Sequence, residues 1–415
     1  MQTQLAPEFQ NTPDGLQAEA ILRKCVHCGF CIATCPTYQL LGDELDSPRG
    51  RIYLIKQVLE GAMPTRKTQL HLDRCLTCRN CESTCPSGVQ YGHLIDIGRK
   101  LVDERVPRPV GDRTVRWALK EGLPSPLFAP AMKIGQAVRG LLPSSLQNKV
   151  PAKQNAGQWP TRGHARQMLM LAGCVQPAMM PNINSATARV LDAAGIEVVL
   201  ADKAGCCGAV KYHLNDQDGG KAEMRRNIDA WWPYVEGGVE ALVMNASGCG
   251  VTVKEYGYIF KSEPAYAEKA ARISELTRDL SELLPVISEA LLANRLDMAD
   301  KIGAGAPKLA FHPPCTLQHG QQLRGGVEQH LGSLGFDIRV SSNEAHLCCG
   351  SAGTYSVLQP EIAYQLRDRK LANLNDMAPE VIVSANIGCI THLQSGTATP
   401  VRHWVELLDE ALLKA

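Results

Sequence analysis

Residues 25–36 read Cys25-Val26-His27-Cys28-Gly29-Phe30-Cys31-Ile32-Ala33-Thr34-Cys35-Pro36, and residues 75–86 read Cys75-Leu76-Thr77-Cys78-Arg79-Asn80-Cys81-Glu82-Ser83-Thr84-Cys85-Pro86. Both stretches have the form C-x2-C-x2-C-x3-C-P. Three cysteines spaced by two residues can wrap around the corners of one small inorganic cluster, while the fourth, followed by proline, is turned away from it. The fourth thiolate of each run is therefore expected to reach the cluster of the other run.

This spacing is typical of bacterial ferredoxins with two [4Fe–4S] clusters. It predicts that Cys25, Cys28, Cys31 and Cys85 hold cluster 1, and that Cys75, Cys78, Cys81 and Cys35 hold cluster 2. The alternatives are a pair of zinc sites or one degenerate run. Eight cysteines in two matching runs overfill a single zinc tetrahedron, which takes four ligands.

The composition is that of a thiol-rich globular protein. The chain has 415 residues, enough for two or three domains with their own cores, and a formal net charge of +1. This balance gives no indication of a nucleic-acid partner. Sixteen cysteines without a secretory signal favour a reducing cytoplasm over a disulfide framework. No apolar run approaches the roughly 18 residues of a spanning helix, so membrane association is expected only through peripheral contact or a partner.

The region around the two cysteine runs is predicted to be helical. Residues 1–15 look like a polar arm, and residues 16–24 have the apolar spacing of a short helix. Ser47 followed by Pro48 is typical of a helix start, with serine as the N-cap and proline in the first turn. Another amphipathic helix is expected over residues 91–104. Residues 1–110 are therefore predicted to form an α-helical ferredoxin domain.

Three basic or titratable residues near the runs have two interpretations each. Arg49 and Arg51 could dock onto a partner or compensate the negative charge of thiolate-bound clusters, or they could lie in a solvated first turn. His27, inside the first run, is expected to pack against its cluster or tune it rather than to bind it.

Residues 111–166 are predicted to connect the ferredoxin domain to the rest of the chain. Residues 111–142 are mostly helical in pattern, with breaks at Pro124, Pro126 and Pro130. The apolar stretch 125–143 is expected to be a helix packed on a domain or partner, with contact to a membrane surface as the alternative. Residues 143–166 have the composition of a linker.

The rest of the chain is an internal duplication. Four segments of residues 167–300 match four of residues 301–415: 168–174 with 309–315, 195–200 with 335–340, 206–208 with 348–350, and 241–249 with 381–389. Apolar, strand-like segments alternate with helical ones and end in cysteines or the triplet Cys-Cys-Gly. The pattern predicts two α/β CCG modules with mostly parallel sheets, so that the whole fold is an α-helical domain followed by α/β modules.

The module cysteines follow predicted strands, at the sheet edge where α/β proteins place ligands. Each module could gather four thiols around an iron–sulfur cluster or another metal ion. The alternatives are a redox-active thiol pair, or buried cysteines that act as small apolar residues at tight turns. The candidate residues are Cys174, Cys206, Cys207 and Cys249 in the first module, and Cys315, Cys348, Cys349 and Cys389 in the second.

Three histidines lie close in sequence to the second set of thiols: His312, His346 and His392. They are expected to be satisfied core or turn residues, with a ligand or proton-relay role as the alternative. Residues 303–305 read Gly-Ala-Gly, which without a strand, a helix and a downstream acid is not a dinucleotide site.

The tandem cysteine runs, the Ser47-Pro48-Arg49-Gly50-Arg51 link and the duplicated modules cover nearly the whole chain. In these features the sequence resembles the iron–sulfur subunits of bacterial glycolate oxidase. It is also similar to a wider group of CCG-domain electron carriers in anaerobic glycerol-3-phosphate dehydrogenase, lactate utilisation and heterodisulfide reductase. Both modules lack the C-x-x-C ending of the last of these: they read Cys249-Gly250-Val251-Thr252 and Cys389-Ile390-Thr391-His392. This departure puts an unusual disulfide-reducing cluster in doubt.

The resemblance implies two partner subunits that bind flavin and oxidise glycolate, or D-lactate, to the 2-oxo acid. This chain would take the electrons and pass them to a quinone-linked acceptor, from a cytoplasmic position at the inner membrane. The chain itself shows no flavin site and no catalytic acid–base cluster, so it is expected to carry electrons rather than to activate a substrate. The alternatives are an iron–sulfur subunit of another CCG-family complex, a thiol or disulfide reductase acting at the CCG cysteines, and a metal-binding scaffold.

Overall fold

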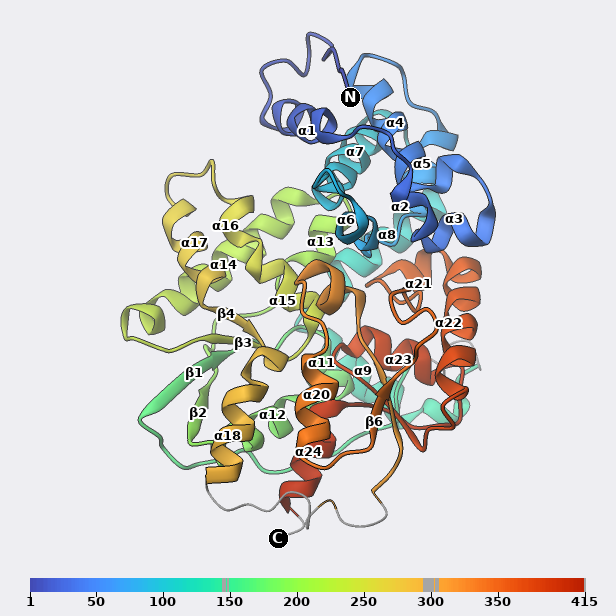
Figure 1. Ribbon diagram of the computed structural model, residues 1–415. Coiled ribbons are helices and arrows are strands. Elements are labelled where there is room, and N and C mark those ends of the chain that lie inside the picture. Colours follow the sequence, from blue (N-terminus) through green and yellow to red (C-terminus); the bar gives the residue numbers. More distant parts are fainter. Residues whose placement is uncertain (144–146, 148, 294–301, 303–305, 414–415) are drawn as a thin grey trace.

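The computed structural model describes residues 1–143, 147, 149–293, 302 and 306–413. Figure 1 shows a helical N-terminal region packed on two α/β modules, the first in green and yellow and the second in orange and red. This arrangement confirms the predicted fold class. The Gly-Ala-Gly stretch at 303–305 lies outside the described residues.

The N-terminal region is built from short helices. Each cysteine run leads into one of the shortest, and these two helices pack against each other. The elements are α1 (Pro13–Lys24), α2 (Phe30–Ala33), α3 (Pro36–Leu41), η1 (Glu44–Asp46), α4 (Pro48–Leu59), α5 (Arg66–Asp73), α6 (Asn80–Thr84) and α7 (Tyr91–Arg105).

Local sequence signals explain where several of these helices begin. Ser47 caps α4 by accepting a hydrogen bond from the Gly50 amide at 3.0 Å, and Pro48 occupies the first turn, as predicted. The first residues are not a free polar arm: Leu5 and Phe9 are buried in the core of the helical region. The expected arm is therefore wrong, because two apolar side chains spaced four residues apart pack against α1 and α4.

The connecting segment is helical at first and then irregular. It contains α8 (Val110–Gly122), α9 (Phe128–Ala137) and η2 (Arg139–Leu141), and residues 151–164 form neither helix nor strand. Pro130 does not interrupt a helix, contrary to what the sequence predicts, but lies in the first turn of α9. An amide proton at this position would have had no intrahelical partner, so its absence costs nothing. None of the described helices is long and apolar enough to cross a bilayer.

The first module has a four-stranded parallel sheet of order β2-β1-β3-β4. Its strands are β1 (Arg166–Met170), β2 (Ile196–Val199), β3 (Leu242–Met244) and β4 (Thr277–Asp279). Its helices are α11 (Gln176–Met179), α12 (Asn182–Ala193), α13 (Ala209–His213), α14 (Gln217–Glu236), α15 (Ser247–Lys254), α16 (Tyr256–Ile259), α17 (Ala267–Leu276), η3 (Leu280–Leu283) and α18 (Leu284–Ala293).

The second module repeats this topology with the order β6-β5-β7-β8, again parallel throughout. Its strands are β5 (Leu309–His312), β6 (Ile338–Val340), β7 (Val381–Ser384) and β8 (Val401–His403). Its other elements are η4 (Thr316–Gly320), α20 (Gly326–Ser333), α21 (Tyr355–Leu358), α22 (Pro360–Asn375), α23 (Ile387–Gln394) and α24 (Trp404–Leu413). The predicted parallel sheets are confirmed, and the edge strands β4 and β8 are additional.

The two modules share one hydrophobic core, which holds α12 of the first against α24 of the second. Arg189 on α12 donates to both carboxylate oxygens of Asp409 on α24, at 2.8 and 2.7 Å. The modules are thus joined by buried apolar surface and a bidentate ion pair, which favours a fixed relative position.

Candidate metal centres

The first candidate centre is a cavity in the N-terminal region lined by cysteines of both runs. Cys25, Cys28 and Cys31 of the first run and Cys85 of the second all line it, together with Cys81. Cys85 follows the end of α6, and α6 packs against α2, which lies within the first run. The chain therefore places the last cysteine of the second run beside the first three cysteines of the first.

The second candidate centre is a neighbouring cavity lined by three cysteines of the second run and one of the first. Cys75, Cys78 and Cys81 line it together with Cys35, which precedes Pro36 and helix α3. Cys81 lines both cavities, so the two centres are adjacent. The structure brings together the two sets of four thiols that the spacing predicts as ligands.

The backbone of the two runs has the same shape at equivalent positions. His27 and Gly29 have φ of 56° and 86°, and Thr77 and Arg79 have φ of 51° and 60°. Alternating right- and left-handed residues turn successive amide groups to one side of the loop, an arrangement found at many iron–sulfur sites. The shared conformation shows that the two runs are structural repeats as well as sequence repeats.

Three of the eight thiols lie where burial disfavours the thiolate, whereas Cys28 is exposed. Burial raises the pKa of Cys78 and Cys81, and burial together with the nearby Cys25 raises the pKa of Cys31 to about 11. Thiols of this kind become anionic only if positive charge is brought to them. Hydrogen-bond donors also reach sulfur: the Thr77 amide lies 3.4 Å and the Tyr91 hydroxyl 3.6 Å from Cys75 Sγ. The donor set thus fits two [4Fe–4S] clusters, whose potentials respond to such contacts.

Arg51 supplies fixed positive charge beside the second cavity. It is 1% exposed and donates to the His71 carbonyl at 2.7 Å, to Thr37 Oγ1 at 3.1 Å and to Asp46 at 3.3 Å. Burial opposes its charge, but the nearby thiols, first that of Cys75, outweigh burial and raise its pKa. The interpretation of Arg51 as a solvated residue is therefore wrong, whereas the less buried Arg49 lines the first cavity and pairs with Glu44.

The first module gathers its four cysteines at the carboxyl edge of its sheet. These thiols shift one another's pKa: Cys206 raises the pKa of Cys174, and Cys206 and Cys249 raise that of Cys207. The tight turn after the vicinal pair requires Gly208, whose φ is 87° and whose missing Cβ would lie 2.7 Å from the Gly220 carbonyl oxygen.

A buried acid that the sequence reasoning missed adjoins these thiols. Burial, together with the charge of Cys206, raises the pKa of Glu223 to about 8. Its side chain is 7% exposed. Nothing in the sequence near Glu223 marks it, because it reaches the thiols from α14 on the far side of the turn.

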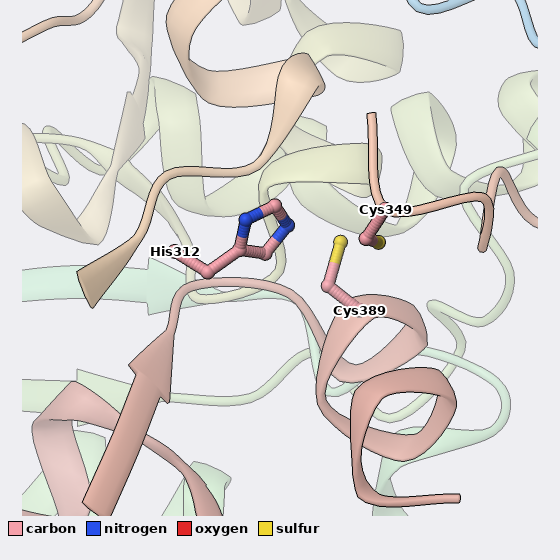
Figure 2. A group of neighbouring side chains, drawn as sticks. All are labelled: His312, Cys349 and Cys389. Carbon is pink, nitrogen blue, oxygen red and sulfur yellow. The ribbon is translucent and has the colours of Figure 1, made fainter. Parts of the chain in front are cut away.

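The second module brings its four cysteines together in the same way. All four residues are buried. Cys348 raises the pKa of Cys315. Cys348 also acts to lower the pKa of Cys349, but Cys389 and burial outweigh it and raise that pKa. The three histidines predicted near this site have different contacts. His312 lies beside Cys349 and Cys389 (Figure 2), whereas His392 hydrogen-bonds the Ala363 carbonyl at 3.1 Å. His346 contributes its backbone carbonyl, which accepts a hydrogen bond from His319.

The second module also packs directly on the second cavity. Cys78 packs in one buried apolar cluster with Cys315, Cys348 and Tyr355. The Tyr355 hydroxyl donates to the Arg74 carbonyl at 2.9 Å. The second candidate cluster site and the thiols of the second module are therefore neighbours.

His319 is a further contact between these parts that sequence reasoning missed. Its Nδ1 lies 2.9 Å from the Ser83 hydroxyl of the second cysteine run, and its Nε2 lies 2.8 Å from the His346 carbonyl. No spacing signal marks His319, because its partner lies far away in the chain.

Comparisons with known proteins agree with this architecture. A family model for a 4Fe-4S dicluster domain matches residues 21–89, and one for a cysteine-rich domain matches residues 168–254 and 309–394. The chain is 55% identical to the glycolate oxidase iron-sulfur subunit of Escherichia coli (strain K12) over 100% of both chains. It is 29% identical to the probable glycolate oxidase iron-sulfur subunit of Bacillus subtilis (strain 168), over 98% of this chain and 97% of that one.

A more distant relative shares part of the chain. The lactate utilization protein A of Bacillus licheniformis is 30% identical over 57% of this chain and 96% of its own length. The dicluster model together with the two cysteine runs supports two [4Fe–4S] clusters as cofactors of this chain, and an oxidoreductase role in electron transfer. From its full-length identity and its domain order, the chain belongs to the family of glycolate oxidase iron–sulfur subunits.

Proposed function

We propose that this chain is the electron-transfer subunit of a flavin-dependent glycolate dehydrogenase complex that also accepts D-lactate. In this proposal two partner subunits bind flavin and oxidise the substrate, and the electrons pass through this chain to a quinone-linked acceptor. The single observation that carries the proposal is the pair of adjacent four-thiol cavities in a chain 55% identical to a glycolate oxidase iron-sulfur subunit.

The ligand sets follow from the two cavities. Cys25, Cys28, Cys31 and Cys85 would hold one cluster, and Cys75, Cys78, Cys81 and Cys35 the other. A [4Fe–4S] cluster, when bound, takes up and releases one electron at a potential set by charge, hydrogen bonds to sulfur and solvent exposure. The chain's own contribution is to fix the thiols, to exclude water from the second cavity and to place Arg51 beside it.

The first cavity has the surface expected of a contact with a redox partner. Cys28 is exposed, and Val26 and Phe30 beside it are 68% and 64% exposed. Tyr53, which is 46% exposed, lies next to the first cysteine run: its ring centroid is 6.5 Å from that of His27. Apolar side chains around an exposed ligand provide dry contact area for a partner. We therefore assign the flavoprotein contact to this surface, defined by Val26, Phe30 and Tyr53.

The second cavity, unlike the first, borders the interior of the protein, where it meets the second module. Cys78 lines the second cavity and packs against Cys315 and Cys348. The CCG cysteines of the two modules are accordingly proposed as sites for a further cluster or metal ion. Thiol or disulfide chemistry at these residues is the competing proposal, and the close contacts within each set of thiols are the observation behind it.

A second exposed apolar surface suggests how the complex could meet the inner membrane. Helices α8 and α9 contain no buried residue. Leu127, Ile134 and Leu141 are 74%, 66% and 87% exposed. We propose a cytoplasmic protein that associates peripherally with the membrane through the complex. Flotation of the complex with vesicles should then be weakened by the triple substitution of these residues with glutamate.

The experiment that tests the function starts with anaerobic purification of the tagged chain together with its copurifying proteins. Glycolate, D-lactate and glycerol 3-phosphate are then added separately while visible absorbance is followed. Bleaching by glycolate or D-lactate in the presence of a copurified flavoprotein is expected. Bleaching by glycerol 3-phosphate alone would assign the chain to a different dehydrogenase complex. Bleaching of the isolated chain by a thiol, or recovery of absorbance when a disulfide is added to the dithionite-reduced chain, would favour the reductase.

A further inference from the structure

The two modules differ at one position that adjoins the thiols. His312 occupies the last residue of β5, three residues before Cys315. The corresponding residue of the first module, three before Cys174, is Leu171, which packs in the apolar cluster that contains Cys207. A polar ring in the second module thus replaces an apolar side chain in the first.

His312 is buried without a hydrogen-bond partner. The residue is 1% exposed, and neither Nδ1 nor Nε2 has a partner among the described residues. Buried ring nitrogens are ordinarily satisfied, since leaving them unpaired forfeits the hydrogen bonds that they make to water. By contrast, His392 of the same module bonds the Ala363 carbonyl and stacks on Tyr364. The unpaired imidazole therefore indicates a partner that is not part of the chain.

The geometry identifies that partner. A ring nitrogen of His312, Cys349 Sγ and Cys389 Sγ all lie within 4.8 Å of one another. Figure 2 shows the three side chains converging from the end of β5, the turn after β6 and the first turn of α23. Zinc–sulfur and zinc–nitrogen bonds are about 2.3 and 2.0–2.1 Å long, so donors this close can share one ion with little movement.

The vicinal cysteines divide between two surroundings. Cys349 packs in the core of the modules together with Cys389, whereas Cys348 packs with Cys315 in the cluster that also contains Cys78. The two neighbouring thiols thus have different roles: Cys348 belongs with the second cavity, and Cys349 belongs with His312.

A buried basic residue lies near the second set of thiols. Lys370 is 3% exposed and is held by the Glu344 and Ala345 carbonyls at 2.5 and 3.5 Å. In the first module the buried ionisable neighbour of the thiols is an acid, Glu223. The buried ionisable neighbour of the thiols is therefore basic in the second module and acidic in the first.

We propose that His312, Cys349 and Cys389 form a mononuclear site for a divalent metal ion of zinc type, a site that the first module does not have. Nitrogen and sulfur donors suit Zn²⁺ and the Co²⁺ ion that can replace it. Two thiolates balance the charge of one divalent ion, and a tetrahedron leaves one position for a fourth donor. This site is separate from the eight ferredoxin cysteines that carry the proposed function.

Co²⁺ binding to the full-length chain tests the proposal. The chain is purified anaerobically with its ferredoxin clusters, treated with a chelator and titrated with Co²⁺. We expect one equivalent to bind with thiolate-to-cobalt charge-transfer bands, and X-ray absorption to show nitrogen together with sulfur in the first shell. His312→Ala should weaken binding by at least about tenfold.

Controls separate ligand loss from damage to the fold. His392→Asn changes a histidine of the same module that already has a hydrogen-bond partner, so it should leave Co²⁺ affinity unchanged. His312→Gln keeps a polar side chain of similar size and should still lose the nitrogen signal. Ferredoxin absorbance reports independently on folding and on the proposed electron carrier. Unchanged Co²⁺ affinity in both His312 variants, an all-sulfur shell, or assembly of an iron–sulfur cluster on Cys349 and Cys389 would each overturn the proposal.

Discussion

Arg51 Nη2 lies 3.3 Å from Asp46 Oδ1, and the two side chains are 1% and 0% exposed. This buried pair stands between the two cysteine runs. Asp46 also accepts a hydrogen bond from Arg74 at 2.9 Å, and Arg51 lines the second cavity. The ion pair thus anchors the Ser-Pro-Arg-Gly-Arg link to the cavity and offsets the negative charge of the thiolates there.

Replacing Arg51 by glutamine should destabilise the ferredoxin region and lower the potential of the second cluster. Removing one partner of a buried ion pair typically costs about 3–5 kcal/mol, and the loss here should lie below that range because Arg74 still pairs with Asp46. Loss of positive charge also disfavours the reduced, more negative cluster. Anaerobic thermal unfolding and redox titration followed by electron paramagnetic resonance measure both effects. Arg49→Gln is the control, since Arg49 is 33% exposed, and equal losses in both variants would contradict this account.

Each run contributes its fourth cysteine to the cavity of the other run, so replacing that cysteine should damage the cluster of the other run. Cys35→Ser should impair the cluster held mainly by the second run, and Cys85→Ser the cluster held mainly by the first, because each residue lines the other run's cavity. Electron paramagnetic resonance of the dithionite-reduced variants distinguishes the two signals. If each substitution harmed the cluster of its own run instead, the assignment of ligands would be wrong.

A histidine–aspartate pair predicts how the contact between the helical region and the first module depends on pH. His213 Nδ1 on α13 lies 3.0 Å from Asp96 Oδ1 on α7. The His213 side chain is 42% exposed, so desolvation opposes its charge only weakly, and Asp96 raises its pKa above 6.5. Burial likewise works to raise the pKa of Asp96, but His213 outweighs it and the pKa is lowered below 3.8.

The sign of the effect follows from these two shifts. The His213 contribution is complete below pH 6.5 and is lost as the pH rises through the folded-state pKa, whereas the Asp96 contribution is lost as the pH falls through its own. His213→Asn should therefore lower the thermal midpoint more at about pH 6 than at about pH 9. A midpoint difference that is the same at both pH values, or larger at the higher one, would show that the ion pair contributes nothing.

The surface formed by Val26, Phe30 and Tyr53 predicts a specific loss of partner binding. Tyr53→Glu places charge in this apolar surface without touching a cavity-lining residue, so cluster absorbance should stay intact while the copurified flavoprotein decreases. The matched control is Leu292→Glu, which changes a side chain that is 64% exposed on α18. Equal recovery of flavoprotein with both variants would place the docking surface elsewhere.

Much of the fold could be predicted from the sequence because its signals are local. The Ser47 cap and the duplicated order of elements follow from short-range patterns that the structure reproduces, whereas the strands expected to end in cysteines end a few residues before them. The edge strands β4 and β8 were not predictable in the same way. They are three residues long with a charged or polar central position, Arg278 and Arg402, and only pairing with β3 and β7 makes them strands.

The parts of the site that sequence reasoning missed depend on contacts between distant segments. His319 meets Ser83 across 236 positions, and Glu223 reaches Cys206 from another helix. The three histidines near the second set of thiols look alike in sequence. Only packing shows that His392 is satisfied by a carbonyl, whereas His312, beside two thiols, has no hydrogen-bond partner in the part of the chain that the structure describes.

The most direct test of the central claim separates the two half-reactions of the purified complex. Cys28→Ser changes an exposed cysteine of the first cavity and leaves the flavoprotein untouched. Flavin reduction by glycolate and reduction of a soluble quinone are then measured side by side under anaerobic conditions. The account predicts that flavin is reduced at the wild-type rate while quinone reduction is lost. Quinone reduction at the wild-type rate would contradict the proposal that electrons leave the flavin through this chain.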